Sequence, residues 1–250
     1  MKENEMIFGL RSVIEAVQSG KEVDRILLKK GLQGDLAREL LDTLRGRFIP
    51  VQYVPQERLD RVTRKNHQGV IAFISAVTYQ RLDDLIPFIY EQGRDPFILL
   101  LDGVTDVRNF GAIARTCECA GVDAIVIPSS GSVSVTADAM KTSAGALNHL
   151  PVCKERTING AIRFLRQSGL QVVVASEKAA ELHTDVSYNG PLAIVMGGED
   201  TGVSADNLRI ADHIVRIPQR GAINSLNVST AAAIILYEAI RQKSPPRSDR

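Results

Sequence analysis

The sequence predicts an α/β protein in which helices cover both faces of a mostly parallel sheet. Beyond residue 96, short apolar runs alternate with helical patterns, and this alternation is typical of successive βαβ units. Phe97–Leu101 is apolar throughout, as expected of a strand buried on both faces of a parallel sheet. The first 78 residues alternate helix and strand signals over a shorter length, which predicts a separate small α/β unit.

The spacing of the apolar residues sets the individual elements. In the larger region, strands are expected at 97–101, 124–127, 172–175, 192–196 and 214–217, and helices near 111–120, 137–146, 158–168, 205–210 and 229–242. In the first 78 residues, helices are expected at 10–17, 35–44 and 57–62, and strands at 25–28, 51–54 and 70–77.

These elements predict two domains, residues 1–78 and 96–243. Residues 79–95 are expected to form the linker, with a short helix over 81–86 and a chain break at Gly93-Arg94-Asp95-Pro96. The polar, proline-containing residues 244–250 are expected to be a disordered tail.

Composition excludes several classes of protein. No apolar run approaches the roughly 20 residues that span a bilayer, and the first five residues lack the apolar core of a signal peptide. Three cysteines without a CxxC pair argue against a disulfide framework or a zinc cluster and suit the cytoplasm. A net charge of +1 is unlike that of a strongly basic nucleic-acid coat protein, but it is compatible with an RNA enzyme that has a local basic surface.

Three polar, glycine-bearing stretches begin at expected strand ends: 102–115, 195–202 and 217–229. In an open parallel sheet, ligands bind outside the carboxyl ends of the strands, so all three stretches are candidate site loops. Neither a GxGxxG fingerprint nor a P-loop is present, which disfavours a dinucleotide or sugar-nucleotide enzyme.

The side chains in these stretches have both structural and functional interpretations. Asn109 could cap the helix that follows it. Arg115 lies in an otherwise apolar helix, where it requires an anionic partner unless its side chain extends to the surface. Gly197 and Gly198 form an ordinary turn or allow the backbone to approach a ligand. Ser229 or Thr230 suffices to cap the last helix, which leaves Ser225 and Asn227 without a capping role.

Together the stretches resemble the three motifs of the SpoU (TrmH-type) RNA 2′-O-ribose methyltransferases, in order and in spacing. The matching segments are Asn109-x-Gly111-Ala112-x-x-Arg115, Val195-Met196-Gly197-Gly198-Glu199-x-x-Gly202 and Ile217-Pro218 … Ser225-Leu226-Asn227-Val228-Ser229. Met6–Gly9 and His67–Ala72 resemble the substrate-binding domain of the bacterial 23S rRNA guanosine 2′-O-methyltransferases. One position departs from the family pattern, since Val107 replaces the usual proline after Asp106.

The resemblance implies a fold, a cofactor and a set of site residues. The first domain would be an L30e-like RNA-binding domain, and the second would carry a C-terminal trefoil knot and form a homodimer. S-adenosylmethionine would be the methyl donor and RNA, not DNA, the partner. Cofactor binding would fall to Gly197, Gly198, Ile217 and Leu226, and the reaction centre to Asn109, Arg115, Glu199, Ser225 and Asn227.

Physical chemistry assigns roles within this set. Arginine stays protonated at any physiological pH, so we expect Arg115 to grip the phosphate beside the target ribose and to stabilise oxyanion charge. Ser225 and Asn227 would orient the ribose or the loop. A basic cluster in the first domain would contact RNA phosphates; its members are Arg58, Arg61, Arg64, Lys65 and His67. For His67 a purely structural hydrogen-bonding role is the alternative.

Three alternatives to 23S rRNA guanosine methylation stay open. The substrate could be a tRNA ribose or an rRNA adenosine whose methylation confers antibiotic resistance. The chain could also be a non-catalytic RNA-binding or ribosome-assembly protein, although it retains every polar residue of the three motifs.

Overall fold

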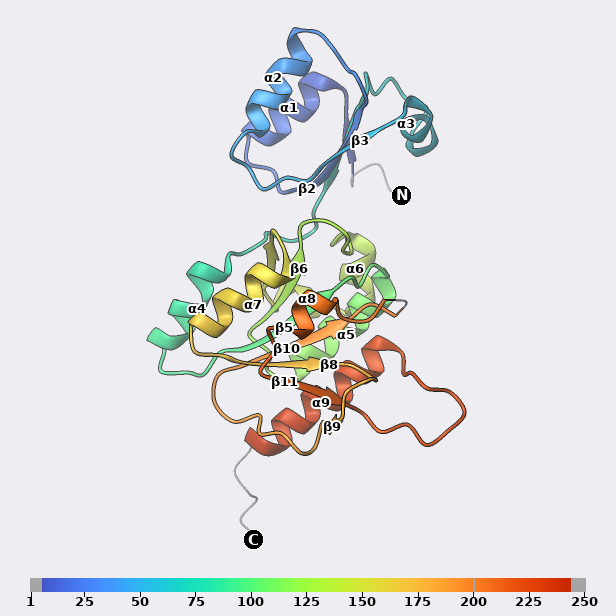
Figure 1. The fold of residues 1–250 in the computed structure, drawn as a ribbon. Helices are drawn as coiled ribbons and strands as arrows, with labels where there is room; N and C mark the ends of the chain where they lie inside the picture. The colour runs from blue at the N-terminus through green and yellow to red at the C-terminus, as the bar shows by residue number, and fades with distance from the viewer. Residues whose placement is uncertain (1–5, 200, 244–250) are drawn as a thin grey trace. The chain divides into compact units, whose positions relative to one another are not determined.

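The computed structural model describes residues 6–199 and 201–243 (Figure 1). The predicted tail at 244–250 lies outside the described residues. Contacts within the chain divide it into two units. The first unit ends at Thr78 and includes Ser134–Ala137, and the second contains Tyr79–Val133 and the residues from Asp138 onward.

The first unit is a mixed four-stranded sheet with helices on both faces. Its strands are β1 (Met6–Phe8), β2 (Val23–Lys29), β3 (Val51–Val54) and β4 (Val70–Ile74), in the order β1-β4-β2-β3. Strand β4 runs antiparallel to both neighbours, whereas β2 and β3 are parallel. Helices α1 (Leu10–Gln18) and α2 (Asp35–Leu44) share one apolar core with the sheet, and α3 (Gln56–Val62) covers the other face through Leu59.

The second unit contains a seven-stranded sheet in which every strand pairing is parallel. Its order is β7-β6-β5-β10-β8-β11-β9. The strands are β5 (Phe97–Asp102), β6 (Ala124–Pro128), β7 (Val152–Glu155), β8 (Gln171–Ala175), β9 (Glu181–Leu182), β10 (Leu192–Gly197) and β11 (His213–Arg216). The predicted parallel α/β architecture of this region is confirmed. The sequence did not predict β1, β7 or β9, which are short strands at sheet edges.

Helices cover both faces of this sheet (Figure 1). Helices α4 (Leu82–Glu91), α7 (Ile158–Gln167) and α8 (Ala205–Leu208) share a core with one face. Helices α5 (Val107–Cys119) and α9 (Val228–Lys243) pack against each other, and α9 also contacts β10. The stretch predicted as one helix over 137–146 contains α6 (Ala137–Thr142) and a 3₁₀ turn that begins at Ala146.

The predicted linker at 79–95 is wrong, because α4 occupies most of it. Leu82, Ile86 and Ile89 are buried, at the spacing of one helix face. Pro87 lies inside this helix. The short helix predicted over 81–86 is therefore longer than expected, because the proline that follows it does not end it, and it belongs to the core of the second unit.

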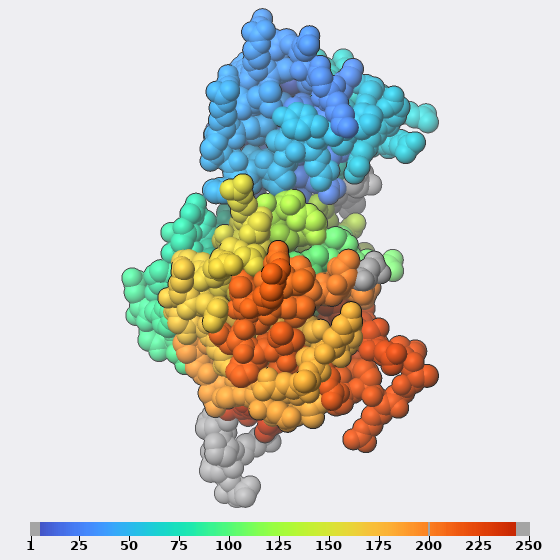
Figure 2. Space-filling view, in the orientation of Figure 1, coloured from blue at the N-terminus to red at the C-terminus, as the bar shows by residue number. Residues whose placement is uncertain are grey.

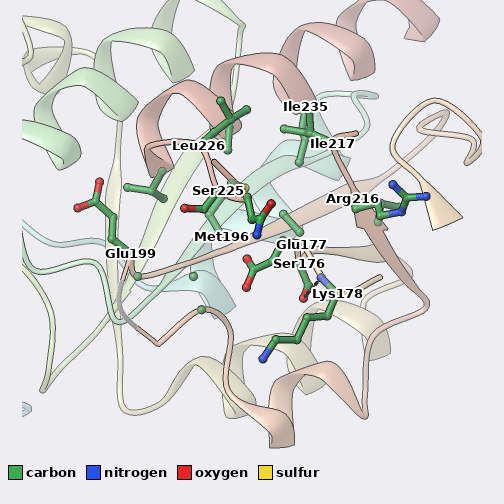
Figure 3. A pocket seen from close by; sticks show the side chains of 18 of the residues that line it. Ser176, Glu177, Lys178, Met196, Glu199, Arg216, Ile217, Ser225, Leu226 and Ile235 are labelled. Atoms are coloured by element: carbon green, nitrogen blue, oxygen red, sulfur yellow. Dashed lines mark hydrogen bonds between the residues drawn. The ribbon is translucent and has the colours of Figure 1, made fainter. Parts of the chain in front are cut away.

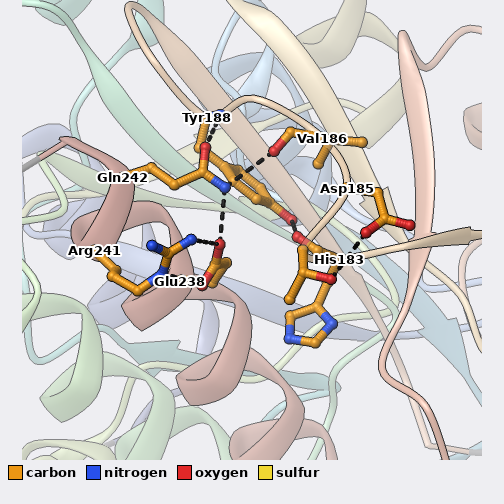
Figure 4. A network of polar contacts seen from close by, with 8 residues as sticks. His183, Asp185, Val186, Tyr188, Glu238, Arg241 and Gln242 are labelled. Carbon is orange, nitrogen blue, oxygen red and sulfur yellow. Dashed lines mark hydrogen bonds and ion pairs between the residues drawn. The ribbon is translucent and has the colours of Figure 1, made fainter.

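The C-terminal part of α9 is fastened to the segment before β10 (Figure 4). The Gln242 amide accepts a hydrogen bond from the Tyr188 backbone N–H at 3.0 Å and donates to the Val186 carbonyl at 3.0 Å. Tyr188 is completely buried, and its hydroxyl donates to the His183 carbonyl at 2.8 Å. Glu238 accepts hydrogen bonds from Arg241 and Gln242. We call this set of contacts between α9 and the segment before β10 the latch.

Two kinds of feature are absent from the described residues. No helix among residues 6–199 and 201–243 is long and apolar enough to cross a membrane. The same residues contain no group of three or more histidine, cysteine or acidic side chains that could hold a metal ion.

Candidate active site

A cavity opens at the carboxyl ends of β8, β10 and β11, where the sequence places its second and third site stretches (Figure 3). Six of the predicted site residues line it: Gly197, Gly198, Glu199, Ile217, Ser225 and Leu226. The loop between β11 and α9 forms one wall, and the first turns of α9 contribute Val228, Ala231 and Ile235. The structure therefore brings the second and third motifs together around one cavity.

The paired glycines are required by the turn that they form. A Cβ atom on Gly197 would lie 2.2 Å from the Gly202 carbonyl carbon, and one on Gly198 would lie 2.5 Å from the Gly103 oxygen. The turn closes through a hydrogen bond from the Gly202 N–H to the Gly198 oxygen at 2.9 Å. The backbone of the chain therefore occupies the space beside both glycines, and of the two interpretations this favours the turn over a close approach to a ligand.

Asp102, at the end of β5, fixes both ends of this turn. Its backbone oxygen accepts from the Gly198 N–H at 2.8 Å. Its Oδ2 accepts from the Ser204 N–H at 2.9 Å and from the side chain of buried Asn207 at 2.8 Å. The sequence reasoning did not assign a role to Asp102, although an acidic residue that directly ends a buried strand was a usable signal.

The helix that carries the first motif begins with a cap from Asp106. Asp106 Oδ1 accepts from the backbone N–H groups of Arg108 and Asn109, at 2.9 and 2.8 Å. Asn109 is therefore not the cap, and its side chain is free for another contact. Its Nδ2 donates to Glu199 Oε1 at 3.1 Å, which joins the first motif to the second.

Asn227 joins the third motif to this pair and also caps α9. Its Nδ2 lies 2.5 Å from Glu199 Oε1 and 2.9 Å from Asn109 Oδ1. Its Oδ1 accepts from the Ser229 N–H at 2.9 Å and from the Thr230 N–H at 3.4 Å. The expectation that Ser229 or Thr230 caps this helix is wrong, because Asn227 precedes the first helical residue and its short amide side chain reaches both N–H groups.

Arg115 lies outside this three-residue cluster of Asn109, Glu199 and Asn227. Six residues of α-helix rotate a side chain by about 240° relative to Asn109, and Arg115 is on the exposed face of α5. Among the described residues it has no hydrogen-bond or ion-pair partner. Of the two interpretations of Arg115, the structure supports a side chain that extends to the surface, since α5 buries only the face that carries Phe110, Ile113 and Cys117.

The cavity also contains residues that the sequence reasoning missed. Ser176, Glu177 and Lys178 line it directly after β8, and Met196 and Gln219 contribute further side chains (Figure 3). The signal for the first three was available, because they are polar residues that follow a predicted buried strand. They were overlooked because they match none of the three motif segments.

In the first unit the predicted RNA-contacting residues divide into two kinds. Arg58, Arg61, Arg64 and Lys65 are exposed. His67 is only 5% exposed, accepts at Nδ1 from the Gly69 N–H at 3.0 Å and contacts Asp60 Oδ1 through Nε2 at 2.9 Å. Because both ring nitrogens have protein partners, the structure places His67 in the structural role that was its alternative.

Comparisons with known families agree with the motifs. The SpoU rRNA methylase family matches residues 96–237. A second family, described as the RNA 2′-O ribose methyltransferase substrate-binding domain, matches residues 6–80.

The similarity to known proteins extends over nearly the whole chain. A Bacillus subtilis protein named as a TrmH family tRNA/rRNA methyltransferase is 31% identical over 98% of both chains. A Staphylococcus haemolyticus protein of the same description is 33% identical over 96% of this chain and 97% of its own.

Two solved structures are also similar. An AdoMet-bound rRNA methyltransferase from Sinorhizobium meliloti superposes with a TM-score of 0.60 at 26% identity, covering 95% of this chain and 87% of its own. The A. aeolicus TrmH/SpoU tRNA modifying enzyme, at 29% identity and a TM-score of 0.55, covers 64% of this chain and 83% of its own. From the matched motifs, the family match and these relatives, we conclude that the chain belongs to the SpoU rRNA methylase family and is an S-adenosylmethionine-dependent RNA methyltransferase.

Proposed function

We propose that this enzyme methylates the 2′-oxygen of a ribose in RNA, and that its target is a guanosine of 23S rRNA. The observation that carries the ribose assignment is the hydrogen-bonded cluster of Asn109, Glu199 and Asn227. One member of each motif meets there, at a carboxylate that also lines the cavity. Such a cluster holds polar atoms in fixed positions, as required where two reactants must be aligned.

The cavity fits S-adenosylmethionine by the chemistry of its lining. Met196, Ile217 and Leu226 offer an apolar surface for a nucleobase. Glu177 and Glu199 place carboxylates at the same cavity, which suits a ligand that carries a sulfonium cation. When bound, the cofactor supplies an already activated methyl group, so the residues of the chain mainly position the ribose and the donor.

We assign the exposed guanidinium of Arg115 to the RNA. A permanently charged side chain without a protein partner among the described residues is suited to grip a backbone phosphate. In that position it would also stabilise charge that develops on the ribose oxygen. Ser225, exposed in the loop that walls the cavity, would orient the ribose.

The first unit favours rRNA over tRNA as the substrate. The A. aeolicus tRNA modifying enzyme covers only 64% of this chain, whereas the S. meliloti rRNA methyltransferase covers 95%. The part of this chain that the A. aeolicus enzyme leaves unmatched is similar in length to the first unit. We propose that residues 1–78 form an L30e-like domain that binds rRNA, with Arg58, Arg61, Arg64 and Lys65 on its RNA-contacting surface, and that residues 96–243 carry the methyltransferase site.

We further propose a C-terminal trefoil knot and a homodimer. After β11, which lies beyond β8 in the sheet, the chain returns so that α9 packs against α5 and β10. A return of this kind is consistent with a threaded terminus. Tyr237 on α9 is 52% exposed and Ile223 in the preceding loop is 78% exposed, as expected of a surface that a second copy covers. Because its substrate is RNA, we place the enzyme in the cytoplasm.

The decisive experiment measures methyl transfer to defined RNAs. Purified enzyme is incubated with radiolabelled cofactor and with 23S rRNA, tRNA or DNA, and the methylated positions are mapped by their resistance to alkaline hydrolysis. That resistance identifies 2′-O-methylation, because the blocked 2′-oxygen cannot attack the neighbouring phosphate. Label in an alkali-resistant guanosine of 23S rRNA supports the proposal. Label confined to tRNA, to an adenosine or to a base contradicts it.

A further inference from the structure

A second cavity lies wholly within the first unit, and no residue of the three motifs lines it. It has a volume of about 430 Å³ and is bounded by the end of β2, by α3 and by the loop 65–69. Three cationic side chains line it, from Lys29, Arg64 and Lys65. Asp60 lines the same cavity and adds a carboxylate to the cations.

The floor of this cavity is rigid. Because His67 Nδ1 accepts from the Gly69 N–H, the ring proton lies on Nε2 and is donated to Asp60 Oδ1. Gln68 adopts a left-handed backbone with φ of 50°, and its Oε1 accepts from the Leu10 N–H at the start of α1. A loop held by contacts to two other elements presents its groups without the cost of ordering them on binding.

Asp60 keeps one oxygen for a ligand. Oδ1 accepts from His67 at 2.9 Å and from Gln56 at 3.2 Å, whereas Oδ2 has no partner among the described residues. The side chain of Asp60 is 54% exposed, so Oδ2 can be reached from solvent. The hydrogen bond from His67 lowers the pKa of Asp60, so the carboxylate is ionised at neutral pH.

The cationic and anionic side chains that line this cavity together determine which class of ligand it can bind. A phosphate alone would be repelled by the Asp60 carboxylate, and a simple cation would be repelled by Lys29 and Arg64. A nucleotide satisfies both groups, because its phosphate meets the cations while donors on its base meet the carboxylate. Among the four bases, guanine alone offers two adjacent donors, N1–H and the exocyclic amine, on its Watson–Crick edge. Both can converge on the single free oxygen, Oδ2 of Asp60, where adenine, cytosine or uracil can donate only once.

We propose that this cavity binds an unpaired guanine nucleotide of the RNA substrate, with Asp60 accepting from the base and Lys29 and Arg64 contacting the phosphate. Unpaired bases are the part of an RNA that proteins read directly, because their edges are accessible. The inference rests on the proposed role of the first unit in RNA binding and adds a base preference to it. The guanine is a recognition base, and the methylated ribose need not be its own.

The test uses the full chain and end-labelled single-stranded octamers of adenosine that carry guanosine, inosine or adenosine at the fourth position. Inosine lacks only the exocyclic amine of guanine. Fluorescence anisotropy should show guanosine bound more tightly than inosine by about tenfold or more, the size expected for one hydrogen bond to a charged acceptor. Asp60→Asn keeps an acceptor for His67 but exchanges the second oxygen for an amine, and it should abolish this ratio.

Two control variants distinguish a loss of base recognition from a general loss of charge or of folding. Asp35→Asn removes the same charge from the same unit at a side chain that is 99% exposed, and it should leave the ratio at its native value of about tenfold or more. Arg64→Ala should weaken binding of all three octamers alike. The guanine site is refuted if native protein binds guanosine and inosine octamers equally, or if Asp60→Asn retains the native ratio. If native protein binds no octamer even at low salt, the RNA-binding role of the first unit fails as well.

Discussion

Asn227 donates to Glu199 Oε1 across 2.5 Å while the oxygen of the same amide caps α9. One side chain therefore couples the start of the last helix to the carboxylate at the cavity. Asn109 reaches the same Glu199 oxygen from α5. A change at Asn227 can be designed to break one of these connections and keep the other.

Asn227→Asp should preserve the helix cap and lose methyl transfer. Aspartate caps as well as asparagine does, but it has no N–H to donate to Glu199 and places a second negative charge beside it. Asn227→Ala should lose transfer and, in addition, about 1 kcal/mol of stability through the missing cap. Urea unfolding and a methyl-transfer assay on both variants check this. Wild-type turnover in Asn227→Asp would show that the contact with Glu199 is dispensable.

Gly197→Ala should destabilise the second unit by about 2 kcal/mol, because the added methyl group meets the backbone of Gly202 and overpacks the turn. Cofactor affinity should fall as a consequence of the displaced turn. Gly221→Ala is the matched control, since a Cβ there has its nearest neighbour at 4.0 Å and the backbone needs no positive φ. Calorimetric titration of the cofactor and thermal unfolding measure both effects. Loss of cofactor affinity without loss of stability would indicate instead that Gly197 contacts the cofactor directly.

Arg115→Ala should lower methyl transfer about 100-fold or more while leaving cofactor affinity close to that of the native enzyme. The reason is that Arg115 is absent from the cavity lining and has an exposed position on α5. Single-turnover transfer and calorimetry separate the two quantities. Arg163→Ala on α7 removes an exposed arginine from the same unit and serves as the control. Near-native turnover in Arg115→Ala would rule out the phosphate clamp.

Asp102→Ala and Asn207→Ala should each weaken cofactor binding through the turn that carries Glu199. Asp102 Oδ2 accepts from Asn207 and from Ser204, so Asp102→Ala frees one end of that turn, and Asn207→Ala removes one of the two donors that orient the Asp102 carboxylate. Because the two side chains act through one hydrogen bond, the double variant should lose less affinity than the sum of the single variants. Calorimetric titration of all four proteins gives the coupling energy. Strictly additive losses would contradict a shared role.

Acid should loosen the latch at the end of α9. The hydrogen bond from Arg241 lowers the pKa of Glu238 from its ordinary value of 4.5, with Gln242 adding to the effect. As the pH falls, the unfolded chain takes up this proton before the folded one. The stability that Glu238 contributes is therefore present above about pH 4.5 and is lost as the pH falls through the folded-state pKa.

Glu238→Gln tests this assignment. Urea unfolding at pH 7 and at pH 3.5 should show a smaller loss of stability in the variant than in the native protein. Glu118→Gln, at an exposed position on α5, should lose as much as the native protein does. An unchanged pH dependence in Glu238→Gln would remove Glu238 from the groups that respond to acid.

The strands and helices with the strongest local sequence patterns were predicted most accurately. The strands β5 and β10 are continuous apolar runs and were predicted nearly to the residue. The grouping of the second and third motifs, at the ends of β10 and β11, was also predicted. The helix predicted over 81–86 was too short, since α4 continues through Pro87 to Glu91, and Pro87 concealed that the apolar spacing goes on. Local sequence patterns could not reveal contacts between distant segments, such as the backbone of Gly103 that crowds Gly198 and the side chain of Asn227 that reaches Asn109.

The cavity lining has a consequence for the order in which this protein is made. Every residue that lines the cavity lies between Ala175 and Ile235, whereas the first unit is complete by Thr78 apart from one short segment. Chains emerge from the ribosome with the N-terminus first, and domains fold as they appear. A growing chain can therefore expose a folded RNA-binding surface well before it has anywhere to hold a methyl donor. Substrate capture would precede catalytic competence during synthesis, and an incomplete chain could occupy RNA without modifying it.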